Sequence, residues 1–453
     1  MSRKPLHIAV IGAGIAGLSA SWLLSQRHNV EIFERSDRLG GHAHTVDINV
    51  GGARAGVDAA FIVYNEPNYP NLMALFRHLG VETELSDMSF SVSLDDGRLE
   101  YASDVPRGLF AQKTNMISPR FLAMLLDVRR FYRSARDDLR DGRLAGMSIG
   151  AYLDRQGYGT AFERDHLLPM GAAIWSSNRS KMRAFPADAF VRFFESHGLL
   201  ELRGRPAWRT VTGGSRQYVD RLRTAFNGRV RRHNQIRTLT RTGNGIEALD
   251  QHGVLRRYDH VVIASHADQA LGMLGDATPA EAALLGAISY TRNRAIMHTD
   301  PAQMPRRRSA WASWNYLGHR DEGGGPPHLS YWMNRLQNLD TPEDVFVTLN
   351  PSRPVASEHI LRTFEYDHPF FDARALEAQR RLWSLQGHRN TWFCGSYFGF
   401  GFHEDALQSG LAVAEELGGL NRPWTVREPS GRIHRTAEPP ESVYVPDQLM
   451  AAE

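Results

Sequence analysis

Apolar and polar residues alternate in blocks near the amino terminus. Four apolar residues, Ile8–Ile11, lead into a glycine-containing turn and a run of small and apolar residues that extends to Leu24. A second apolar run follows at Val30–Phe33. Buried parallel strands are often short continuous apolar runs, and a helix connects one such strand to the next. The pattern therefore predicts a strand, a turn, a helix and a second strand, in that order.

The rest of the chain adds further predicted elements. A helix should begin at Tyr69-Pro70 and end at Gly80, because proline suits the first helical turn and glycine the position after the last. Ser89–Leu94 alternates as a strand, and Asp95-Asp96-Gly97 is typical of a hairpin turn. Pro119–Leu139 has the spacing of an amphipathic helix. The remaining predictions are strands at 230–239 and 261–264, sheet strands within 286–370, and a strand ending at Gly395 before a helix that starts near Glu404.

Three glycines give the first predicted turn a specific chemistry. Gly12, Gly14 and Gly17 stand at the GxGxxG spacing directly after the first strand. In that arrangement the first glycine permits a tight turn, the second lets the backbone approach a pyrophosphate, and the third lets the helix pack close to the strand. The second strand ends at Glu34, about twenty residues on, where a carboxylate can accept the hydroxyls of an adenosine ribose. An ordinary glycine turn does not account for Glu34, so the unit predicts dinucleotide binding.

The next segment indicates which dinucleotide binds. In the stretch ERSDRLGGHAHT, Glu34 is followed by Arg38, the pair Gly40-Gly41 and Thr45. This stretch resembles the second phosphate-binding signature of the flavin amine oxidase and phytoene desaturase superfamily. Its glycines let the chain pass the pyrophosphate from the opposite side, and Arg38 can add charge-assisted hydrogen bonds. An NAD enzyme with a single nucleotide-binding unit does not need this second contact, so the sequence favours FAD.

Two further segments are similar to flavin-binding segments of the superfamily. Asp58–Phe61 stands where relatives bring backbone up to the isoalloxazine ring. Residues 390–417, NTWFCGSYFGFGFHEDALQSGLAVAEEL, resemble the C-terminal flavin motif, in which a helix start points N–H groups at the flavin. Cys394 lies outside the position where monoamine oxidases bond the flavin covalently. The resemblance therefore implies non-covalent FAD.

The resemblance also implies individual FAD contacts and shows where this chain departs from the pattern. His42 stands in place of an arginine, Ala60 in place of a glycine, and Ser396 in place of an acidic residue. The implied cofactor-binding residues are Gly12, Gly14, Ile15, Ala16, Gly17, Glu34, Arg35, Arg38, Gly40, Gly41, His42, Thr45, Ala60, Phe61, Gln235, Ile236, Ala264, Gly395, Ser396, His403 and Glu404.

Together these segments predict an α/β fold, α+β overall. A Rossmann-like FAD-binding domain of the amine oxidase type is expected to be interleaved with a substrate domain of mixed sheet plus helices. The FAD-binding domain is expected at 1–85, 205–272 and 389–420, and the substrate domain at 86–204 and 273–388. Residues 421–453, with several prolines and alternating charges, are expected to form a tail.

Composition narrows the class of protein. The chain has 453 residues, enough for two domains, and its net charge of +3 is no sign of nucleic-acid binding. A single cysteine excludes an internal disulfide and suits the cytoplasm. Residues 8–24 are uncharged but interrupted by glycines, and no other uncharged stretch approaches twenty residues, so no transmembrane helix is expected. No metal site is predicted.

Peripheral contact with a membrane stays open. The helix predicted at 119–139 carries Arg129, Arg130, Arg133 and Arg136, and Arg306–Arg308 forms a second basic cluster. Such a helix can lie on anionic lipid, or it can cover the substrate domain with its arginines in solvent. The expected location is cytoplasmic, peripheral to the inner face of the membrane. The apolar residues expected on the opposite face are Phe121, Leu122, Leu125, Val128, Phe131 and Tyr132.

A closer resemblance concerns the reaction. The segments PMGAAIWS, FFESHGLL, RPAWRTVTGGSRQYV and CGSYFGFGFHEDALQSG are similar to a bacterial group of NAD/FAD-binding proteins linked with cyclopropane-fatty-acid synthase-like methyltransferases. One branch resembles the flavin-dependent desaturase of furan fatty acid synthesis. This resemblance implies a desaturase or dehydrogenase of methyl-branched acyl chains of membrane lipids, with hydride transfer to flavin N5. Two other functions stay open, an oxidase of a small amine and a flavoprotein partner of a lipid methyltransferase. A homodimer is also left open.

Candidate catalytic residues are few. Amine oxidases of the superfamily commonly place a lysine near N5 through a water, whereas this chain has no lysine after Lys181. His298 lies on the segment where relatives keep that lysine, and its imidazole either takes the proton or is structural. Trp175 and Phe402 either line the site at the face of the flavin or pack in the protein core. Glu404 either acts electrostatically or is only a first-turn acid of its helix.

Overall fold

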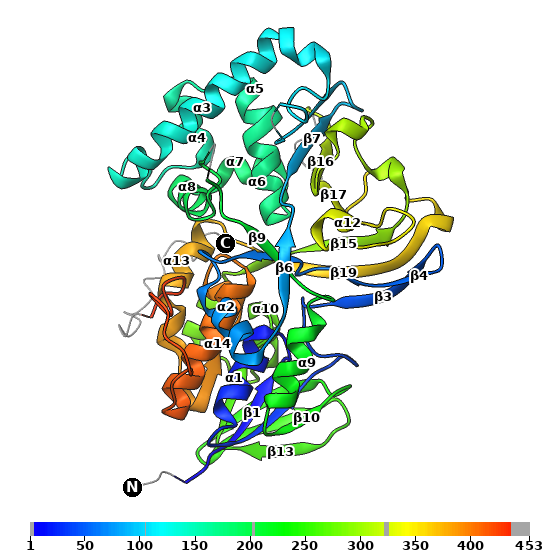
Figure 1. Cartoon of the computed structure of the whole chain (residues 1–453). Helices are drawn as coiled ribbons and strands as arrows, with labels where there is room; N and C mark the ends of the chain where they lie inside the picture. Colours follow the sequence, from blue (N-terminus) through cyan, green and yellow to red (C-terminus); the bar gives the residue numbers. More distant parts are fainter. Residues whose placement is uncertain (1–3, 105, 202–203, 321–325, 436–453) are drawn as a thin grey trace, which may run out of the picture. The chain divides into compact units, whose positions relative to one another are not determined.

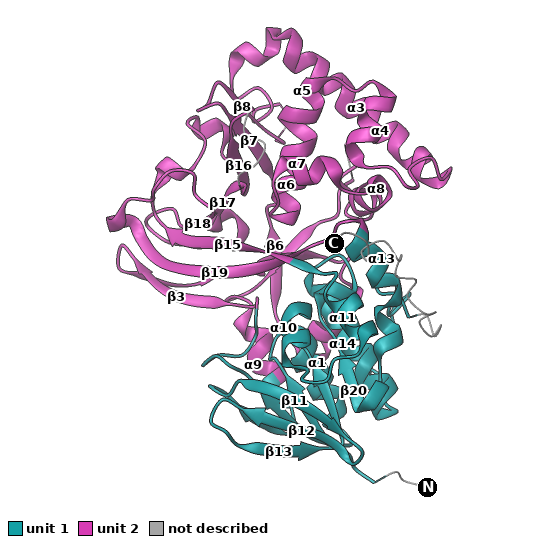
Figure 2. Ribbon diagram, turned by 180° about the vertical axis from the view of Figure 1, so that it is seen from behind, with its two compact units in different colours: residues 1–41, 223–289, 374–453 teal, residues 42–222, 290–373 magenta. Residues whose placement is uncertain are grey.

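The computed structural model describes residues 4–104, 106–201, 204–320 and 326–435. The chain divides into two compact units, which Figure 2 colours separately. Unit 1 comprises residues 1–41, 223–289 and 374–453, and unit 2 comprises residues 42–222 and 290–373. Both units combine helices with sheets, which confirms the predicted α/β, α+β overall class.

A five-stranded parallel sheet forms the centre of unit 1. Its strand order is β10 (Arg229–Arg231), β2 (Asn29–Phe33), β1 (His7–Ile11), β14 (His260–Ile263) and β20 (Thr391–Phe393). The apolar residues of β1 and β14 are buried, as expected for parallel strands that are covered on both faces. Because all five strands run in the same direction, their carboxyl ends share one edge, which is where open α/β sheets bind ligands.

Two helices of unit 1 approach each other closely through small residues. They are α1 (Ile15–Leu24), dark blue in Figure 1, and α14 (His403–Gly418), orange. A Cβ atom on Gly410 of α14 would lie 2.3 Å from the carbonyl oxygen of Ala16 in α1. Only glycine permits this separation, so Gly410 fixes the distance between the two helices.

The strand predicted at 230–239 is interrupted. β10 ends at Arg231, and β11 (Ile236–Thr242) begins a separate antiparallel sheet with β12 (Gly245–Asp250) and β13 (Leu255–Tyr258). His233, between them, has a φ of 50°, a left-handed conformation that no strand continues through. The segment predicted as one strand thus contributes to two sheets. The other helices of unit 1 are α10 (Ala267–Met273), α11 (Pro279–Leu285) and α13 (Ala373–Leu382), of which only the first residue belongs to unit 2.

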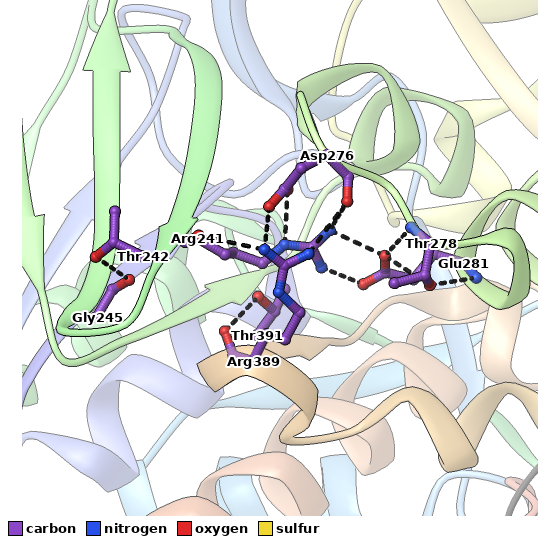
Figure 3. A network of polar contacts seen from close by, with 8 residues as sticks. All are labelled: Arg241, Thr242, Gly245, Asp276, Thr278, Glu281, Arg389 and Thr391. Atoms are coloured by element: carbon purple, nitrogen blue, oxygen red, sulfur yellow. Dashed lines mark hydrogen bonds and ion pairs between the residues drawn. The ribbon is translucent and has the colours of Figure 1, made fainter.

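A buried ion-pair network ties β11 to its surroundings in unit 1, as Figure 3 shows. The guanidinium of Arg241, whose side chain is only 1% exposed, forms a bidentate pair with Glu281 and donates from Nε to Asp276 at 2.8 Å. Glu281 also accepts from Thr278 in the capping box of α11. Arg389, just before β20, bonds Asp276 as well. The network therefore connects β11, α11 and the start of β20.

Unit 2 is built on a seven-stranded mixed sheet. The strand order is β19 (Ile360–Phe370), β15 (Ser289–His298), β18 (Phe346–Leu349), β17 (His328–Trp332), β16 (Trp314–Gly318), β7 (Phe90–Leu94) and β8 (Leu99–Ala102). Strands β16 and β7 are parallel, whereas β15–β18, β18–β17, β17–β16 and β7–β8 are antiparallel. The sheet predicted within 286–370 is thus confirmed, and it extends to the hairpin near residue 95.

Several local predictions in unit 2 are confirmed. Helix α2 spans Pro70–Leu79 and ends at Gly80, which adopts φ 66°. The turn at Asp95-Asp96-Gly97 has positive φ at all three residues and joins β7 to β8. Helix α3 spans Pro119–Arg140. The strand predicted from Ser89 begins one residue later, at Phe90.

Unit 2 contains further, shorter elements. The strands are β3 (Thr45–Val50), β4 (Ala53–Asp58), β5 (Val63–Asn65), β6 (Thr83–Ser86) and β9 (Trp208–Val211), and the helices are α4 (Ile149–Gln156), α5 (Thr160–Phe162), α6 (Leu168–Trp175), α7 (Arg179–Ala184), α8 (Ala187–Ser196) and α12 (Met333–Leu336). Helix α9 (Arg216–Ala225) begins in unit 2 and ends in unit 1. The 3-10 and π turns are η1 (Lys113–Ile117), η2 (Glu163–Leu167), η3 (Pro301–Gln303), η4 (Arg308–Ala310), η5 (Ser357–His359), η6 (Trp383–Leu385), η7 (His388–Asn390) and η8 (Ser396–Phe398).

The boundaries of the two units differ from those of the predicted domains. The chain first enters unit 2 after Gly41 rather than after residue 85. The reason is that β3 to β6 pair among themselves and with β9, all within unit 2. The two units are defined by their internal packing, whereas the predicted domains are defined by expected contacts with the cofactor. The unit bounds therefore do not test the predicted domain boundaries, which stay predictions. No helix among the described residues is both long and apolar enough to cross a membrane.

Candidate functional site

The glycine-rich turn of unit 1 links β1 to α1. Gly12 has a φ of 102°, and a Cβ atom there would lie 2.6 Å from the carbonyl oxygen of Ala264. A Cβ atom on Gly17 would lie 1.9 Å from the carbonyl oxygen of Gly12. Both glycines are therefore required by the protein's own packing, the first for the turn and the second for the close approach of helix to strand.

Gly14 differs from the other two glycines. Its φ is −73°, which any residue can adopt, and a Cβ atom on it would meet nothing within 4 Å. It is the N-cap of α1, yet no side chain caps the helix and its first turn has no acidic residue. The first N–H groups of a helix have no intrahelical partner and carry its positive end. The chain thus leaves open space and unused donors at this point, as a pyrophosphate site requires.

A second glycine pair lies against the same turn. Gly40 forms a parallel bridge with Gly14, and its N–H donates to the carbonyl oxygen of Ala13 at 2.7 Å. A Cβ atom on Gly41 would lie 3.0 Å from the Cα atom of Gly14. The two glycine segments, predicted from separate motifs, are therefore adjacent in unit 1 and present only backbone to each other.

Glu34 lies beside these glycines at the end of β2. Its Oε2 accepts from the N–H of Ala13 at 2.9 Å, and its Oε1 accepts from the N–H and hydroxyl of Ser36 at 2.9 and 2.8 Å. A carboxylate has about four acceptor positions, so capacity for a ribose hydroxyl remains. Glu34 thus braces the turn and keeps capacity to accept a further hydrogen bond beside it. Arg35 next to it is exposed.

The C-terminal flavin segment follows β20 at the same edge of the sheet. The N–H of Gly395 donates to the hydroxyl of Ser409 at 2.9 Å, and that hydroxyl lies 3.1 Å from the carbonyl oxygen of Gly395. Cys394 is fully buried, and burial raises the pKa of its thiol. A thiol kept protonated is a poor nucleophile, which agrees with non-covalent FAD.

The start of α14 carries several charged groups. The N–H of Phe402 donates to Asp405 at 2.7 Å, and Arg432 pairs with the same carboxylate at 2.5 Å. Glu404 is completely buried and accepts from Gln408 at 2.9 Å, while burial lowers the pKa of His403 to about 3. Arg432 lies in the predicted tail, and nothing in its local sequence pointed to this contact.

The segment expected near the isoalloxazine ring lies in unit 2. Main-chain bonds fix it, from Ala59 N–H to the carbonyl oxygen of His44 at 2.8 Å and from Phe61 N–H to that of His42 at 2.9 Å. Ala60, which departs from the family pattern, sits between these two bonds. Its position is therefore set by its neighbours rather than by its own side chain.

A buried carboxylate, Asp58, anchors this segment. It accepts from the hydroxyl of Thr45 at 2.5 Å, from the N–H and hydroxyl of Ser215, and from Gln337 at 2.9 Å. Burial raises the pKa of Asp58 to about 6 despite these donors. The sequence interpretation assigned Thr45 to the cofactor and missed Ser215. In the structure the hydroxyl of Thr45 is used by Asp58 and by the N–H of Arg216, so its geometry gives no support to a cofactor contact.

The two residues expected to contact the adenine differ in their exposure. Ile236 is buried, and Gln235 is exposed with its carbonyl oxygen accepting from the N–H of Gln251 at 2.8 Å. That carbonyl is therefore already engaged. The adenine contacts of Gln235 and Ile236 stay predictions.

His298 lies at the end of β15 in a closed polar network. Its Nδ1 accepts from the N–H of Asp300 at 3.1 Å, so the proton belongs on Nε2, which donates to Thr348 at 2.7 Å. Thr348 in turn bonds Ser330 at 2.7 Å. The side chain is 0% exposed, and burial lowers the pKa of His298 to about 4. This arrangement is that of a structural histidine, because both ring nitrogens are occupied; a role as proton acceptor stays a prediction that the geometry does not favour.

The other two catalytic candidates have different surroundings. Trp175 is buried among Phe185, Phe190 and Phe193, with ring centroids 4.8, 5.6 and 4.8 Å away. It therefore packs in an aromatic core of unit 2, the alternative left open above. Phe402 is the N-cap of α14 in unit 1. Its role at the flavin stays a prediction.

Comparison with known families identifies the chain. The model of the flavin containing amine oxidoreductase family matches residues 15–308, more than half of the sequence. The chain belongs to this family. Its cofactor is FAD, and the open space at Gly14, the adjoining Gly40-Gly41 and the carboxylate of Glu34 fit the dinucleotide part of that cofactor.

Curated relatives include oxidases of amines and amino acids. The flavin-dependent L-tryptophan oxidase RebO of Lentzea aerocolonigenes is 26% identical over 284 residues, which are 59% of this chain and 55% of that protein. The flavin-containing amine oxidase A of Equus caballus is 31% identical over 128 residues, 26% of this chain and 21% of that protein. The chain spans about half the length of the first curated relatives it matches.

Solved structures share the fold over nearly the whole chain. A redesigned putrescine oxidase has a TM-score of 0.66 at 15% identity, covering 91% of this chain and 98% of that one. A CLA-producing fatty acid isomerase from P. acnes has a TM-score of 0.63 at 16% identity, covering 91% and 97%. At these identities the likeness shows the fold alone, and proteins of different activity share it.

Proposed function

We propose that this flavoprotein is an FAD-dependent desaturase or dehydrogenase that acts on fatty acyl chains of membrane lipids, methyl-branched chains among them. The observation that carries the proposal is the absence of any lysine after Lys181. The resemblance to amine oxidases implies a lysine in the second substrate-domain segment, and this chain cannot supply one there. A reaction that does not need such a lysine is therefore favoured.

The three lysines of the chain lie elsewhere. They are Lys4, Lys113 and Lys181. Lys181, in α7, places its Nζ 4.9 Å from the centre of the Phe370 ring, a cation–π contact within unit 2. Lys113 is exposed in η1. Neither surrounding resembles a lysine that holds a water at a flavin.

The surroundings of His298 support the same conclusion. The segment expected to carry the lysine carries a neutral histidine whose two nitrogens are both hydrogen-bonded. An amine substrate must lose protons as it is oxidised, and a basic residue near the reacting atom assists that loss. Dehydrogenation of an acyl chain removes a hydride and a proton from adjacent carbons, and the proton can leave to solvent. Bound FAD would supply the hydride acceptor.

Oxidation of an amine is the second candidate function. It is favoured by the curated relatives, which include oxidases of amines and of L-tryptophan. A putrescine oxidase and a fatty acid isomerase share the fold equally well, so the fold does not choose between the candidates. A third alternative is a flavoprotein that presents lipid to a methyltransferase without oxidising it.

Anaerobic reduction of the flavin separates the three functions. The purified holoprotein would be mixed with phospholipid that carries methyl-branched acyl chains, with a primary amine, or with buffer, and the visible flavin absorbance would be followed. Bleaching by the lipid alone is the expected result, with a new double bond in the acyl chain by mass spectrometry. Bleaching by the amine would establish the second candidate, and no bleaching by either would leave the non-oxidative role.

A further inference from the structure

Exposed apolar side chains are concentrated in one short stretch of unit 2. Seven large apolar residues of the described chain are substantially exposed, and four of them lie within eleven residues of each other. These are Met116 (57%), Ile117 (81%), Leu122 (41%) and Leu126 (69%). They belong to η1 and to the first turns of α3, the long cyan helix of Figure 1. A group of exposed apolar side chains on one surface often marks a site that binds another protein or a membrane.

The exposed residues of α3 continue into a basic stripe. Leu122, Leu126, Arg129 and Arg133 follow at intervals of four, three and four, so they lie on one face of the helix. The buried face is formed by Phe121, Met124, Val128, Phe131 and Tyr132. The prediction that Leu122 belongs to the buried face is therefore wrong. The outer face is apolar in its first half and cationic in its second.

The arginines of this stripe differ from other arginines of α3. Arg129 and Arg133 are exposed and have no ion-pair or hydrogen-bond partner among the described residues. By contrast, Arg120 pairs with Asp165 at 2.9 Å, and Arg136 pairs with Glu201 at 2.6 Å. Two cations are thus available to an anion from outside the protein.

A shallow surface hollow lies between these cations. Its lining residues are Leu126, Arg129, Arg130, Arg133, Ser134 and Asp137. Arg130 is held over the ring of Tyr158 at 4.0 Å and pairs with Asp127 at 3.1 Å, and Asp137 pairs with Arg140 at 3.4 Å. The only acidic group of the hollow is therefore already partnered, and the free charges in it are positive.

We propose that η1 and the outer face of α3 dock onto an anionic lipid surface. The four apolar side chains would enter the boundary between headgroups and acyl chains, while Arg129 and Arg133 contact lipid phosphates. A lipid surface is the occupant that offers both an apolar interior and a dense layer of negative charge. The inference goes beyond the proposed function and does not rest on it, because it concerns binding and not oxidation.

Two arginines of the second basic cluster predicted from the sequence are already paired within unit 2. Arg307 pairs with the buried Glu100 at 2.8 Å. Arg308 pairs with Asp344 at 2.9 Å and lies over the ring of Trp311 at 3.9 Å. These two side chains are engaged within unit 2, so the proposed membrane contact is assigned to η1 and α3.

Vesicle flotation of the full-length holoprotein tests the proposal. Vesicles of phosphatidylcholine alone would be compared with vesicles that contain a third of phosphatidylglycerol. Two double variants each change one half of the surface. Arg129→Glu with Arg133→Glu changes the basic half, and Ile117→Asn with Leu126→Asn changes the apolar half. Matched controls make two changes of the same kind at exposed sites elsewhere, Arg362→Glu with Arg374→Glu, and Val254→Asn with Leu255→Asn.

We expect the parent and both controls to float with anionic vesicles and poorly with neutral ones. Each test variant should bind anionic vesicles at least about tenfold more weakly, since each basic residue near an anionic leaflet and each buried apolar group contributes several-fold. Equal flotation of test variants and controls would overturn the proposal. The proposal would also be overturned if the parent protein sediments as a dimer, the test variants sediment as monomers, and their flotation is unchanged. The face would then be an interface between two copies of the chain.

Discussion

Replacement of Gly14 by valine should remove FAD while leaving the protein folded. A Cβ atom at this position would meet no atom of the protein within 4 Å, and the φ of −73° suits valine. Valine is a poorer N-cap residue than glycine, so the free energy of unfolding should fall by about 1 kcal/mol. The side chain would instead occupy the open space next to the first turn of α1, where the pyrophosphate is expected.

The loss of affinity can be sized from the contacts that would be blocked. Two charge-assisted hydrogen bonds from helix N–H groups to phosphate are each worth about 1.5–3 kcal/mol. Losing both weakens FAD binding by about 3–6 kcal/mol, a factor of roughly 10² to 10⁴. Gly14→Ala, with a smaller side chain in the same open space, should give an intermediate loss.

Gly17→Ala is the matched comparison, because its methyl group would lie 1.9 Å from a backbone oxygen of Gly12. Here the protein itself must move, at a cost of about 3 kcal/mol or more. The assay is the ratio of bound flavin to protein, combined with urea unfolding of the apo forms. Full flavin occupancy in Gly14→Val would refute the assignment of the phosphate site. Unfolding of apo Gly14→Val as early as that of Gly17→Ala would show that the flavin is lost through instability instead.

Three further outcomes are expected. Removing one partner of the buried pair in unit 1, by Arg241→Met or Glu281→Leu, should lower the free energy of unfolding by about 3–5 kcal/mol, while the double variant should recover most of this loss in the same urea titration. The lowered pKa of His298 means that its neutral form stabilises the protein fully above pH 6.5 and that this contribution, about 3 kcal/mol, is lost as the pH falls toward 4. In urea melts across that range His298→Gln should show a shallower decline, and an unchanged slope would contradict the assignment. Acid precipitation should release the flavin into the supernatant, because Cys394 is buried and protonated; colour retained in the pellet would indicate a covalent bond.

Local patterns were sufficient to predict the segments whose structure is set by neighbouring residues. Helix α2 was predicted to the residue, because Pro70 fixes its own φ at a helical value and Gly80 can adopt the left-handed φ that ends the helix. The turn after β1 was predicted because Gly12 and Gly17 can only be glycine at that spacing. In each case the residue types at a few fixed positions are enough to indicate the local conformation.

Predictions failed where distant residues decide the outcome. The sequence of residues 230–239 does not show that His233 turns the chain from one sheet to another, because that left-handed residue is stabilised by the sheets on either side. Helix periodicity placed Leu122 on the buried face, yet it lies at the margin of the apolar arc and the packing partners stop short of it. Arg432 was assigned to a tail, since its contact with Asp405 spans many residues and leaves no local signature.

Buried carboxylates near the departing positions explain how the chain tolerates its departures from the family pattern. In unit 2, Asp58 accepts four hydrogen-bonding groups and holds the strand end from which Ala60 follows. In unit 1, Asp405 caps α14 and pairs with Arg432, which fixes the helix start after Ser396. Where the backbone is positioned by such anchors, the side chain at the departing position is free to change, because a flavin contact made through main-chain groups does not depend on it. We therefore expect the flavin geometry to depend more on these anchors than on the altered positions themselves.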